Sequence, residues 1–306
     1  MYASEAKHCL CGAPLHAAAV PHVLRGVFRF EQRIAHGSEG AVYRAVDLGL
    51  GRNVAIKALS RVTDDRMRAI VQEARAMARV AHPNLAMIHG VEAWRDTSFL
   101  VQEYLQQGTL AQRLSRARLT VEDALELGVT LADLLIHLHR AELMHCDIKP
   151  SNIGYTADGV LKLFDFGLAR GPVAIAPPLD GAPREVVGTP FYMSPEAIAG
   201  APPSPAVDLW ALGVVLYEAI AGRRPFDGAT TPDVLAAIVG GRRPPPIPGA
   251  MPALSTFFDG VFDRDPARRP STAADVRDRL SQLRSSHVPT ELAGSFHAVS
   301  DARSSR

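Results

Sequence analysis

The hydrophobic pattern of the chain changes its period near residue 105, and this change limits the folds that the chain can adopt. Before that point the pattern is mostly that of strands bounded by glycine-containing turns, in Phe28–Ile34, Ala41–Asp47 and Arg52–Ala58. After it, apolar residues recur at helical spacing, as in Thr120–Arg140. Strands followed by helices predict an α+β fold.

Capping residues and apolar content predict further helices. One helix interrupts the strands, because Asp64 or Asp65 can cap a run whose apolar residues recur at i, i+3, i+4 and i+7. Asp208–Gly222 is apolar nearly all round, so we expect a buried helix there. The last regular helix is predicted over roughly Thr272–Leu283.

Composition excludes several classes of protein. The 306 residues, 47% hydrophobic and 21% charged, are typical of a soluble globular protein with a sizeable core. The net charge of +1 gives no electrostatic reason to expect nucleic acid as a partner. The most apolar run, Leu209–Ile220, is too short to span a membrane, and the start lacks the pattern of a secretory signal. With only three cysteines as well, we expect a cytoplasmic protein without a membrane partner.

Residues 145–152, His-Cys-Asp-Ile-Lys-Pro-Ser-Asn, gather side chains suited to phosphoryl transfer. Asp147 can accept a proton, Lys149 can neutralise a transferring phosphoryl group, and Asn152 can offer an amide oxygen to Mg²⁺. Asp165 follows an apolar strand and precedes Phe-Gly, so it can also reach a metal. Alone, the Asp-Phe-Gly tripeptide is a common turn.

A glycine-containing turn and a buried lysine come earlier in the chain. Gly37 and Gly40 can let backbone N–H groups approach phosphate oxygens, although two glycines in a hairpin are more often just a turn. Lys57 ends a buried strand and needs a counter-charge, since an unpaired buried ammonium is costly. Glu73, on the inward stripe of the capped helix, is the candidate partner. For either residue alone, the alternative is a solvated side chain.

In their order and spacing, these motifs resemble those of the protein kinase family. The matching segments are Val54–Lys57, residues 145–152, Asp165–Gly167, Gly188–Glu196 and Asp265–Pro270. The resemblance implies a bilobal α+β fold, with a small antiparallel β lobe that holds one helix and a larger helical lobe. Lys149, two residues after Asp147, and the Gly-Thr-Pro run that begins at Gly188 resemble the corresponding segments of serine/threonine kinases. The composition resembles that of bacterial kinases of the eukaryotic-like (Hanks) type.

The resemblance also implies domain boundaries. The kinase domain is expected to cover residues 27–284, with lobes at 27–104 and 105–284. The Ala- and His-rich residues 1–26 are expected to be an extension, and the polar residues 285–306 a disordered tail.

The activity implied is transfer of the γ-phosphate of ATP to Ser or Thr hydroxyls of protein substrates, with Mg²⁺ or Mn²⁺. Asp147, Lys149 and Lys57 would be catalytic, and Asn152 and Asp165 would hold the metal. The residues implied to bind ATP are Ile34, Gly37, Gly40, Val42, Ala55, Lys57, Glu73, Glu103 and Leu105. Those implied to dock the substrate or to hold the fold are Thr189, Glu196, Asp208 and Arg269.

Three residues depart from the family pattern. Ala35 replaces the first glycine of the turn, Cys146 replaces an Arg, and Gly154 replaces a bulky aliphatic residue beneath the adenine. Because glycine cannot fill that space, the affinity for ATP is expected to be modest unless Tyr155 or Leu161 compensates.

Cys146 bears on regulation. In relatives with Arg at this position, that Arg binds a phosphorylated residue of the activation loop. Here residues 167–188 contain no Ser, Thr or Tyr. We therefore hypothesise activity without activation-loop phosphorylation, with Asp180 or Glu185 as a permanent negative charge. Redox control through Cys146 is a less favoured alternative, and any signal is expected through a protein partner or the termini.

Other interpretations stay open at this point. A pseudokinase would bind nucleotide without transferring phosphate, and a small-molecule phosphotransferase of the related fold would act on small alcohols. The sequence sets neither the acceptor preference nor the oligomeric state. His8, Cys9, Cys11 and His16 offer four metal ligands, but Cys-x-Cys is tighter than the usual zinc spacing, so an unstructured segment is favoured.

Overall fold

The computed structural model describes residues 20–37, 40–59, 64–77, 79–166 and 190–286, without the side chains of residues 64–67, 69 and 73. The candidate metal ligands near residue 10 lie outside these ranges. By its packing the chain divides into two units. Unit 1 holds the described parts of residues 1–64 and 87–104, and unit 2 those of 65–86 and 105–306.

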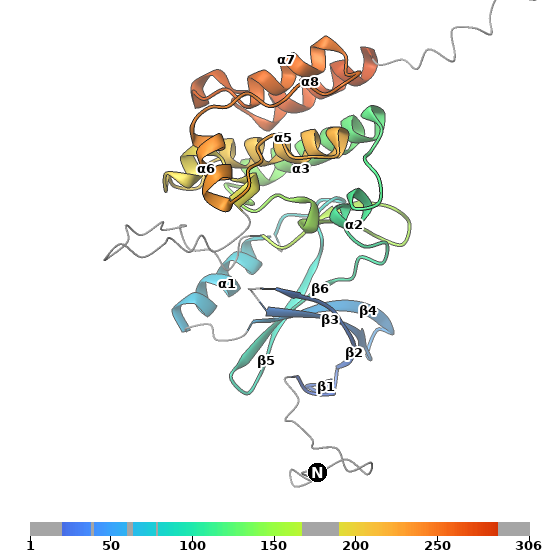
Figure 1. Ribbon diagram of the computed structural model, residues 1–306. Helices are drawn as coiled ribbons and strands as arrows, with labels where there is room; N and C mark the ends of the chain where they lie inside the picture. Colours follow the sequence, from blue (N-terminus) through green and yellow to red (C-terminus); the bar gives the residue numbers. More distant parts are fainter. Residues whose placement is uncertain (1–19, 38–39, 60–63, 78, 167–189, 287–306) are drawn as a thin grey trace, which may run out of the picture. The chain divides into compact units, whose positions relative to one another are not determined.

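Unit 1 is a six-stranded sheet, whose strands are drawn in blue to cyan in Figure 1. The strands are β1 (Val23–Leu24), β2 (Phe28–Gly37), β3 (Gly40–Asp47), β4 (Arg52–Leu59), β5 (Ile88–Trp94) and β6 (Thr97–Glu103). Their order in the sheet is β1-β2-β3-β4-β6-β5, and every neighbouring pair is antiparallel.

One face of this sheet forms the core of unit 1. Its buried residues are Leu24, Ala45, Val54, Ile56, Ala58, Phe99 and Val101. Because side chains alternate along a strand, Ala55 and Lys57 of β4 and Leu100 and Gln102 of β6 project from the opposite face. The lysine predicted to bind phosphate therefore lies on the sheet face away from that core.

The sheet begins earlier than the sequence predicted. Val23 and Leu24 pair with Arg29 and Phe28 as strand β1, although they lie in the expected extension 1–26. Leu24 is fully buried in the core of unit 1. A strand of two residues is too short to show a period in the sequence. The burial of Leu24 holds β1 on the sheet. The extension therefore ends before Val23.

Unit 2 is mainly helical (Figure 1). Its helices are α1 (Asp64–Met77), α2 (Leu110–Leu114), α3 (Val121–Arg140), α4 (Pro195–Ile198), α5 (Pro205–Ala221), α6 (Thr231–Val239), α7 (Pro252–Val261) and α8 (Ala273–Ser286). Three short 3-10 helices are η1 (Pro150–Asn152), η3 (Pro190–Tyr192) and η4 (Pro266–Arg268). A two-stranded antiparallel sheet pairs β7 (Ile153–Tyr155) with β8 (Leu161–Leu163). Residues 285 and 286, expected in the tail, belong to α8.

Two long helices, α3 and α5, form the centre of unit 2. Thr120 caps α3, since its side chain accepts from the backbone N–H of Asp123. The leucine stripe of α3 is buried, and α3 packs against α5 and α8. Helix α5 is buried on nearly all sides, as its composition predicted, and ends at Gly222, whose φ of 69° is left-handed.

The segment that leads from α1 to β5 belongs to unit 2, not to the lobe 27–104 that the sequence predicted. The backbone N–H of Ala86 donates to the carbonyl of Leu163 (3.0 Å), and that of Leu163 donates to Asn84 (2.8 Å). Leu85 and Leu163 form a parallel bridge. The segment thus extends the β7–β8 sheet, which no local sequence pattern could show.

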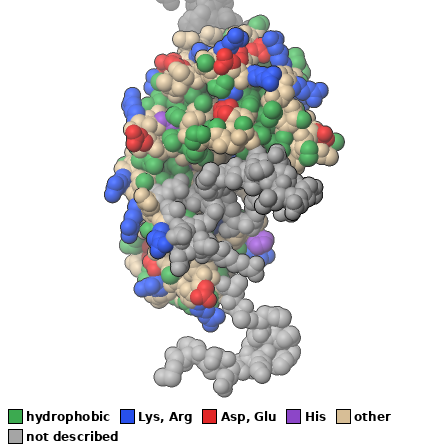
Figure 2. All heavy atoms as spheres, turned by 90° about the vertical axis from the view of Figure 1, so that its left-hand side faces the viewer, with side chains coloured by type: hydrophobic (Ala, Val, Ile, Leu, Met, Phe, Trp, Pro, Cys, Tyr) green, Lys and Arg blue, Asp and Glu red, His purple; other side chains and the backbone are tan. Residues whose placement is uncertain are grey.

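Figure 2 shows one face of the protein. At its top, over α7 and α8, basic and acidic side chains are mixed, and hydrophobic side chains lie below them on the same unit. This mixture of signs agrees with the small net charge of +1. Within the described ranges, no helix has the length and apolar character that crossing a membrane requires.

Candidate active site

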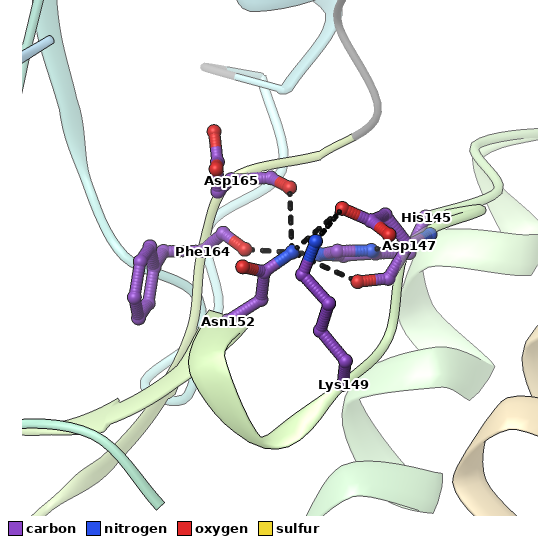
Figure 3. Close-up of polar contacts among 6 residues, drawn as sticks. All are labelled: His145, Asp147, Lys149, Asn152, Phe164 and Asp165. Atoms are coloured by element: carbon purple, nitrogen blue, oxygen red, sulfur yellow. Dashed lines mark hydrogen bonds and ion pairs between the residues drawn. The ribbon is translucent and has the colours of Figure 1, made fainter. Parts of the chain in front are cut away.

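The loop between α3 and η1 brings three of the predicted residues into one hydrogen-bonded group (Figure 3). The Asp147 carboxylate is 8% exposed, and its Oδ2 accepts from Lys149 Nζ (2.7 Å) and from Asn152 Nδ2 (3.0 Å). Pro150 begins the 3-10 helix η1, which carries Asn152 back toward Asp147. The carboxylate therefore has a fixed position beside one cation.

Asn152 fits the predicted role of a metal ligand. Its Nδ2 donates to Asp147 O (2.9 Å), Asp147 Oδ2 (3.0 Å) and Asp165 O (3.3 Å). Since every bond uses the nitrogen, the amide oxygen points away from this group (Figure 3). Mg²⁺ prefers oxygen ligands of this kind.

Asp165, the second predicted ligand, is held differently. Its φ of 58° is left-handed, and its backbone carbonyl accepts from Asn152. Figure 3 shows its carboxylate on the side of the backbone away from Asn152. No three His, Cys, Asp or Glu side chains of the described residues gather as a metal cage. A metal here would need oxygen atoms from a ligand such as a nucleotide phosphate.

His145 is fully buried at the start of the same loop. The backbone N–H of Asp147 donates to its Nδ1 (3.2 Å), so Nε2 carries the proton and donates to Phe164 O (3.2 Å). Burial lowers the pKa of His145 below 6.5, against the opposing effects of Asp208 and Asp147. A neutral imidazole therefore links the loop of Asp147 to the strand end that precedes Asp165.

Asp208 of α5 binds the backbone of this loop. Its fully buried carboxylate accepts from the backbone N–H groups of His145 (2.9 Å) and Cys146 (2.8 Å), and lies 2.9 Å from His139 Nε2. Cys146 has a φ of 61°, which costs a residue with a Cβ about 1–2 kcal/mol. The hydrogen bonds that the backbone N–H groups donate to Asp208 hold this strained position, so Asp208 acts through the backbone of the loop.

In unit 1, three of the residues implied to bind ATP share one sheet face. Val42 of β3 and Leu100 of β6 lie opposite Lys57, and Gln102 lies opposite Ala55. Lys57 is 6% exposed and Ala55 is 5% exposed. Such a face offers a small apolar surface beside one ammonium group.

The remaining ATP-site candidates differ in what the structure shows of them. Gly40 has a φ of 130°, and a Cβ there would collide with the carbonyl oxygen of Ala58, so the fold itself requires glycine. Gly37 pairs with Gly40, and Ile34 is 42% exposed. Glu103 binds Met87 twice, through its backbone N–H (2.8 Å) and its side chain (3.1 Å).

Two of the candidates lie partly or wholly outside the described part of the structure. Glu73 lies in α1, but its side chain is outside the described part of the structure, as is the whole of Thr189. The predicted pairing of Glu73 with Lys57 stays a prediction.

An ion pair joins the segment after Thr189 to the C-terminal part of the domain. Glu196 of α4 accepts from Arg269 Nη1 (2.8 Å), and Arg269 Nε donates to the Asp263 carbonyl (2.7 Å). The Arg269 guanidinium also lies over the Trp210 ring, 4.7 Å from its centroid. The structure thus brings Glu196 and Arg269 together.

Sequence reasoning missed residues that contact Asp208 or line a pocket next to the loop of Asp147. His139 contacts Asp208, and the Tyr192 hydroxyl donates to Glu218 Oε2 (2.6 Å). Burial and the Glu218 carboxylate raise the pKa of Tyr192 well above its usual range. A pocket of about 320 Å³ next to the loop is lined by Ala111, Leu114, Ser115, Lys149, Pro150, Ser151, Tyr192, Glu218 and Gly222. These residues come from distant segments, so no local pattern marks them.

Comparison with known proteins decides the family. Residues 28–280 match the protein kinase domain family. The chain belongs to the protein kinase family. The predicted α+β kinase fold, with a small antiparallel sheet and a larger helical unit, is therefore confirmed.

Individual kinases are similar over most of the chain. Serine/threonine-protein kinase PknA of Mycobacterium tuberculosis (strain ATCC 25618 / H37Rv) is 35% identical over 285 residues, which cover 87% of this chain and 63% of PknA. PknK of the same strain is 33% identical over 85% of this chain and 24% of PknK. Serine/threonine-protein kinase PAK mbt of Drosophila melanogaster is 32% identical over 80% of this chain and 38% of that protein. The chain spans less than two thirds of the length of these relatives.

Proposed function

We propose that this kinase domain transfers the γ-phosphate of ATP to Ser or Thr hydroxyls of proteins, with Mg²⁺ as cofactor. The observation that carries the proposal is the Asp147 carboxylate, held by Lys149 and Asn152 in a loop that Asp208 anchors. The relatives named serine/threonine-protein kinases support the choice of acceptor.

The chemistry follows from these side chains. The substrate hydroxyl oxygen forms a bond to the γ-phosphorus while the bond from that phosphorus to the ADP oxygen breaks, and Asp147 accepts the hydroxyl proton late in the step. Lys149, 2.7 Å from Asp147, offsets charge on the phosphoryl oxygens. When bound, Mg²⁺ would be held by Asn152 and Asp165 and would neutralise phosphate charge. Positioning and electrostatics supply most of the rate.

We further propose that the domain is active without a phosphate on its activation segment. Residues 167–188 contain no Ser, Thr or Tyr, and Cys146 carries no charge that could bind a phosphate. The backbone of the loop is held by two hydrogen bonds to the buried Asp208 carboxylate.

Transfer of labelled phosphate from [γ-³²P]ATP to a generic protein acceptor tests the proposed reaction. With Mg²⁺ we expect steady transfer, and a fall of about 10²–10⁴-fold for Asp147→Asn, which keeps the shape but removes the proton acceptor. ATP binding without transfer would favour a pseudokinase. Transfer to small alcohols and not to protein would favour a small-molecule phosphotransferase.

A further inference from the structure

Gly154 of β7 and Leu105 occupy one shared space in unit 2. Gly154 is buried, and a Cβ built on it would lie 2.5 Å from Leu105 Cδ1, closer than two carbon atoms can approach. The next nearest atoms would be Phe164 Cε1 (3.2 Å) and Gly108 O (3.3 Å). The end of the Leu105 side chain therefore fills the volume that a side chain at position 154 would take.

The turn that carries Leu105 is fixed to β7 and cannot move as a body. Gln107 N–H donates to the Tyr155 carbonyl (3.1 Å), and Tyr155 N–H donates to the Gly108 carbonyl (3.1 Å). Two side-chain bonds add to these, from Gln107 Nε2 to Ala157 O (2.7 Å) and from Ala157 N–H to Gln106 Oε1 (3.1 Å). A group added at position 154 would thus displace the Leu105 side chain and leave its backbone in place.

Neither residue that the sequence offered as compensation fills this space. Tyr155 is the next residue along β7, so its side chain projects from the opposite face, where Leu161 lies across from it and the Arg113 guanidinium covers its ring at 3.3 Å from the centroid. Leu105, by contrast, is only half-buried, so part of its side chain is open to a ligand. It is also the first residue of unit 2 after the strand β6.

We propose that Leu105 supplies the apolar surface beneath the adenine ring, and that Gly154 is the positioning residue that lets the Leu105 side chain lie low enough to leave room for the ring. The inference rests on the proposed use of ATP. The glycine is then no defect in the nucleotide site, and the modest ATP affinity expected from the sequence is not required. The leucine at position 105 supplies the surface beneath the adenine ring, and the glycine at position 154 leaves space for that leucine.

A two-residue cycle tests this pairing. Gly154→Ala should push the Leu105 side chain toward the base and raise the Kd for ATP·Mg²⁺ by about tenfold, or 1.4 kcal/mol. In a Leu105→Ala background the same substitution should change the Kd by less than about twofold, because the closest contact, to Leu105 Cδ1, is then gone. Gly90→Ala is the matched control, since no atom lies within 4 Å of a Cβ there. It should bind ATP as the wild type does.

Thermal unfolding without nucleotide gives a second measurement. Gly154→Ala should lower the Tm more in the wild-type background than in the Leu105→Ala background, since the collision is internal to unit 2. An equal effect of Gly154→Ala on the Kd in both backgrounds, or none in either, would overturn the inference while wild-type transfer leaves the proposed function standing. Failure of the wild-type protein to bind ATP at all would overturn both.

Discussion

At the scale of single residues, the catalytic loop is ordered by groups that are neutral or fully paired. His145 links the loop to Phe164 as a neutral imidazole, and the amide nitrogen of Asn152 donates hydrogen bonds to three acceptors. Asp147 is thereby placed without any cation at position 146. Cys146, which precedes Asp147, and Asp165 both have left-handed φ values.

The neutral state of His145 predicts how stability depends on pH. Its pKa in the folded protein is lowered from 6.5, so below that pH the unfolded chain binds more protons than the folded chain. The free energy of unfolding should therefore be highest above pH 6.5 and fall as the pH drops below it, by at most about 1.4 kcal/mol per pH unit from this group. Chemical unfolding at a series of pH values measures this slope.

His145→Gln should reduce the slope, because the titrating group is gone. The exposed His22→Gln serves as the control and should leave the slope as it is. Some slope should persist in both variants, since burial also lowers the pKa values of His82 and His89. An unchanged slope in His145→Gln would mean that the buried imidazole is not the source.

The residues of this group show what the sequence could and could not predict. Asp147, Lys149 and Asn152 were predicted together because they lie within a few positions of one another. The strained φ of Cys146 is held by Asp208, which lies 62 residues beyond Cys146. Contacts of that range leave no local pattern, so only the residue types could be predicted.

At the scale of elements, helix α5 acts as the support of the catalytic loop. Its buried Asp208 reaches the backbone of two loop residues and His139 of α3. Apolar composition alone predicted that α5 is buried, and the helical spacing of apolar residues in Thr120–Arg140 predicted α3. The helices α6 and α7 were not predicted, because both are short. The pairing of residues 84–86 with β8 was not predicted, because contacts between segments far apart in the sequence leave no local pattern.

Removal of the Asp208 carboxylate should uncouple α5 from the loop. Asp208→Ala leaves two buried backbone N–H groups without an acceptor, which should cost about 3 kcal/mol or more of the free energy of unfolding. The rate of phosphate transfer should fall with it, since Asp147 loses its support. Denaturant unfolding and the transfer assay together measure the two effects.

Asp158→Ala is the control for this substitution, because Asp158 is an exposed aspartate in the turn between β7 and β8. It should change the free energy of unfolding by less than about 0.5 kcal/mol. If Asp208→Ala unfolds and transfers phosphate as Asp158→Ala does, the support assigned to α5 is wrong.

At the scale of the whole molecule, the chain combines a six-stranded sheet with a helical unit that holds the loop of Asp147. The sequence predicted these two kinds of structure from the change of hydrophobic period near residue 105. It placed residues 65–86 with the sheet, whereas their backbone contacts join them to the helical unit. The loop of Asp147 is held from within this helical unit, by α5 and by its own side chains.

The most direct test of a loop ordered without phosphate is the initial rate of transfer by phosphate-free protein. The chain would be treated with a phosphatase, shown by mass spectrometry to carry no phosphate, and then given [γ-³²P]ATP, Mg²⁺ and a protein acceptor. We expect transfer that is linear from the first time point, with the same rate after preincubation with ATP. A lag that ends when phosphate appears on the chain, at Thr189 above all, would contradict activity without a phosphate switch.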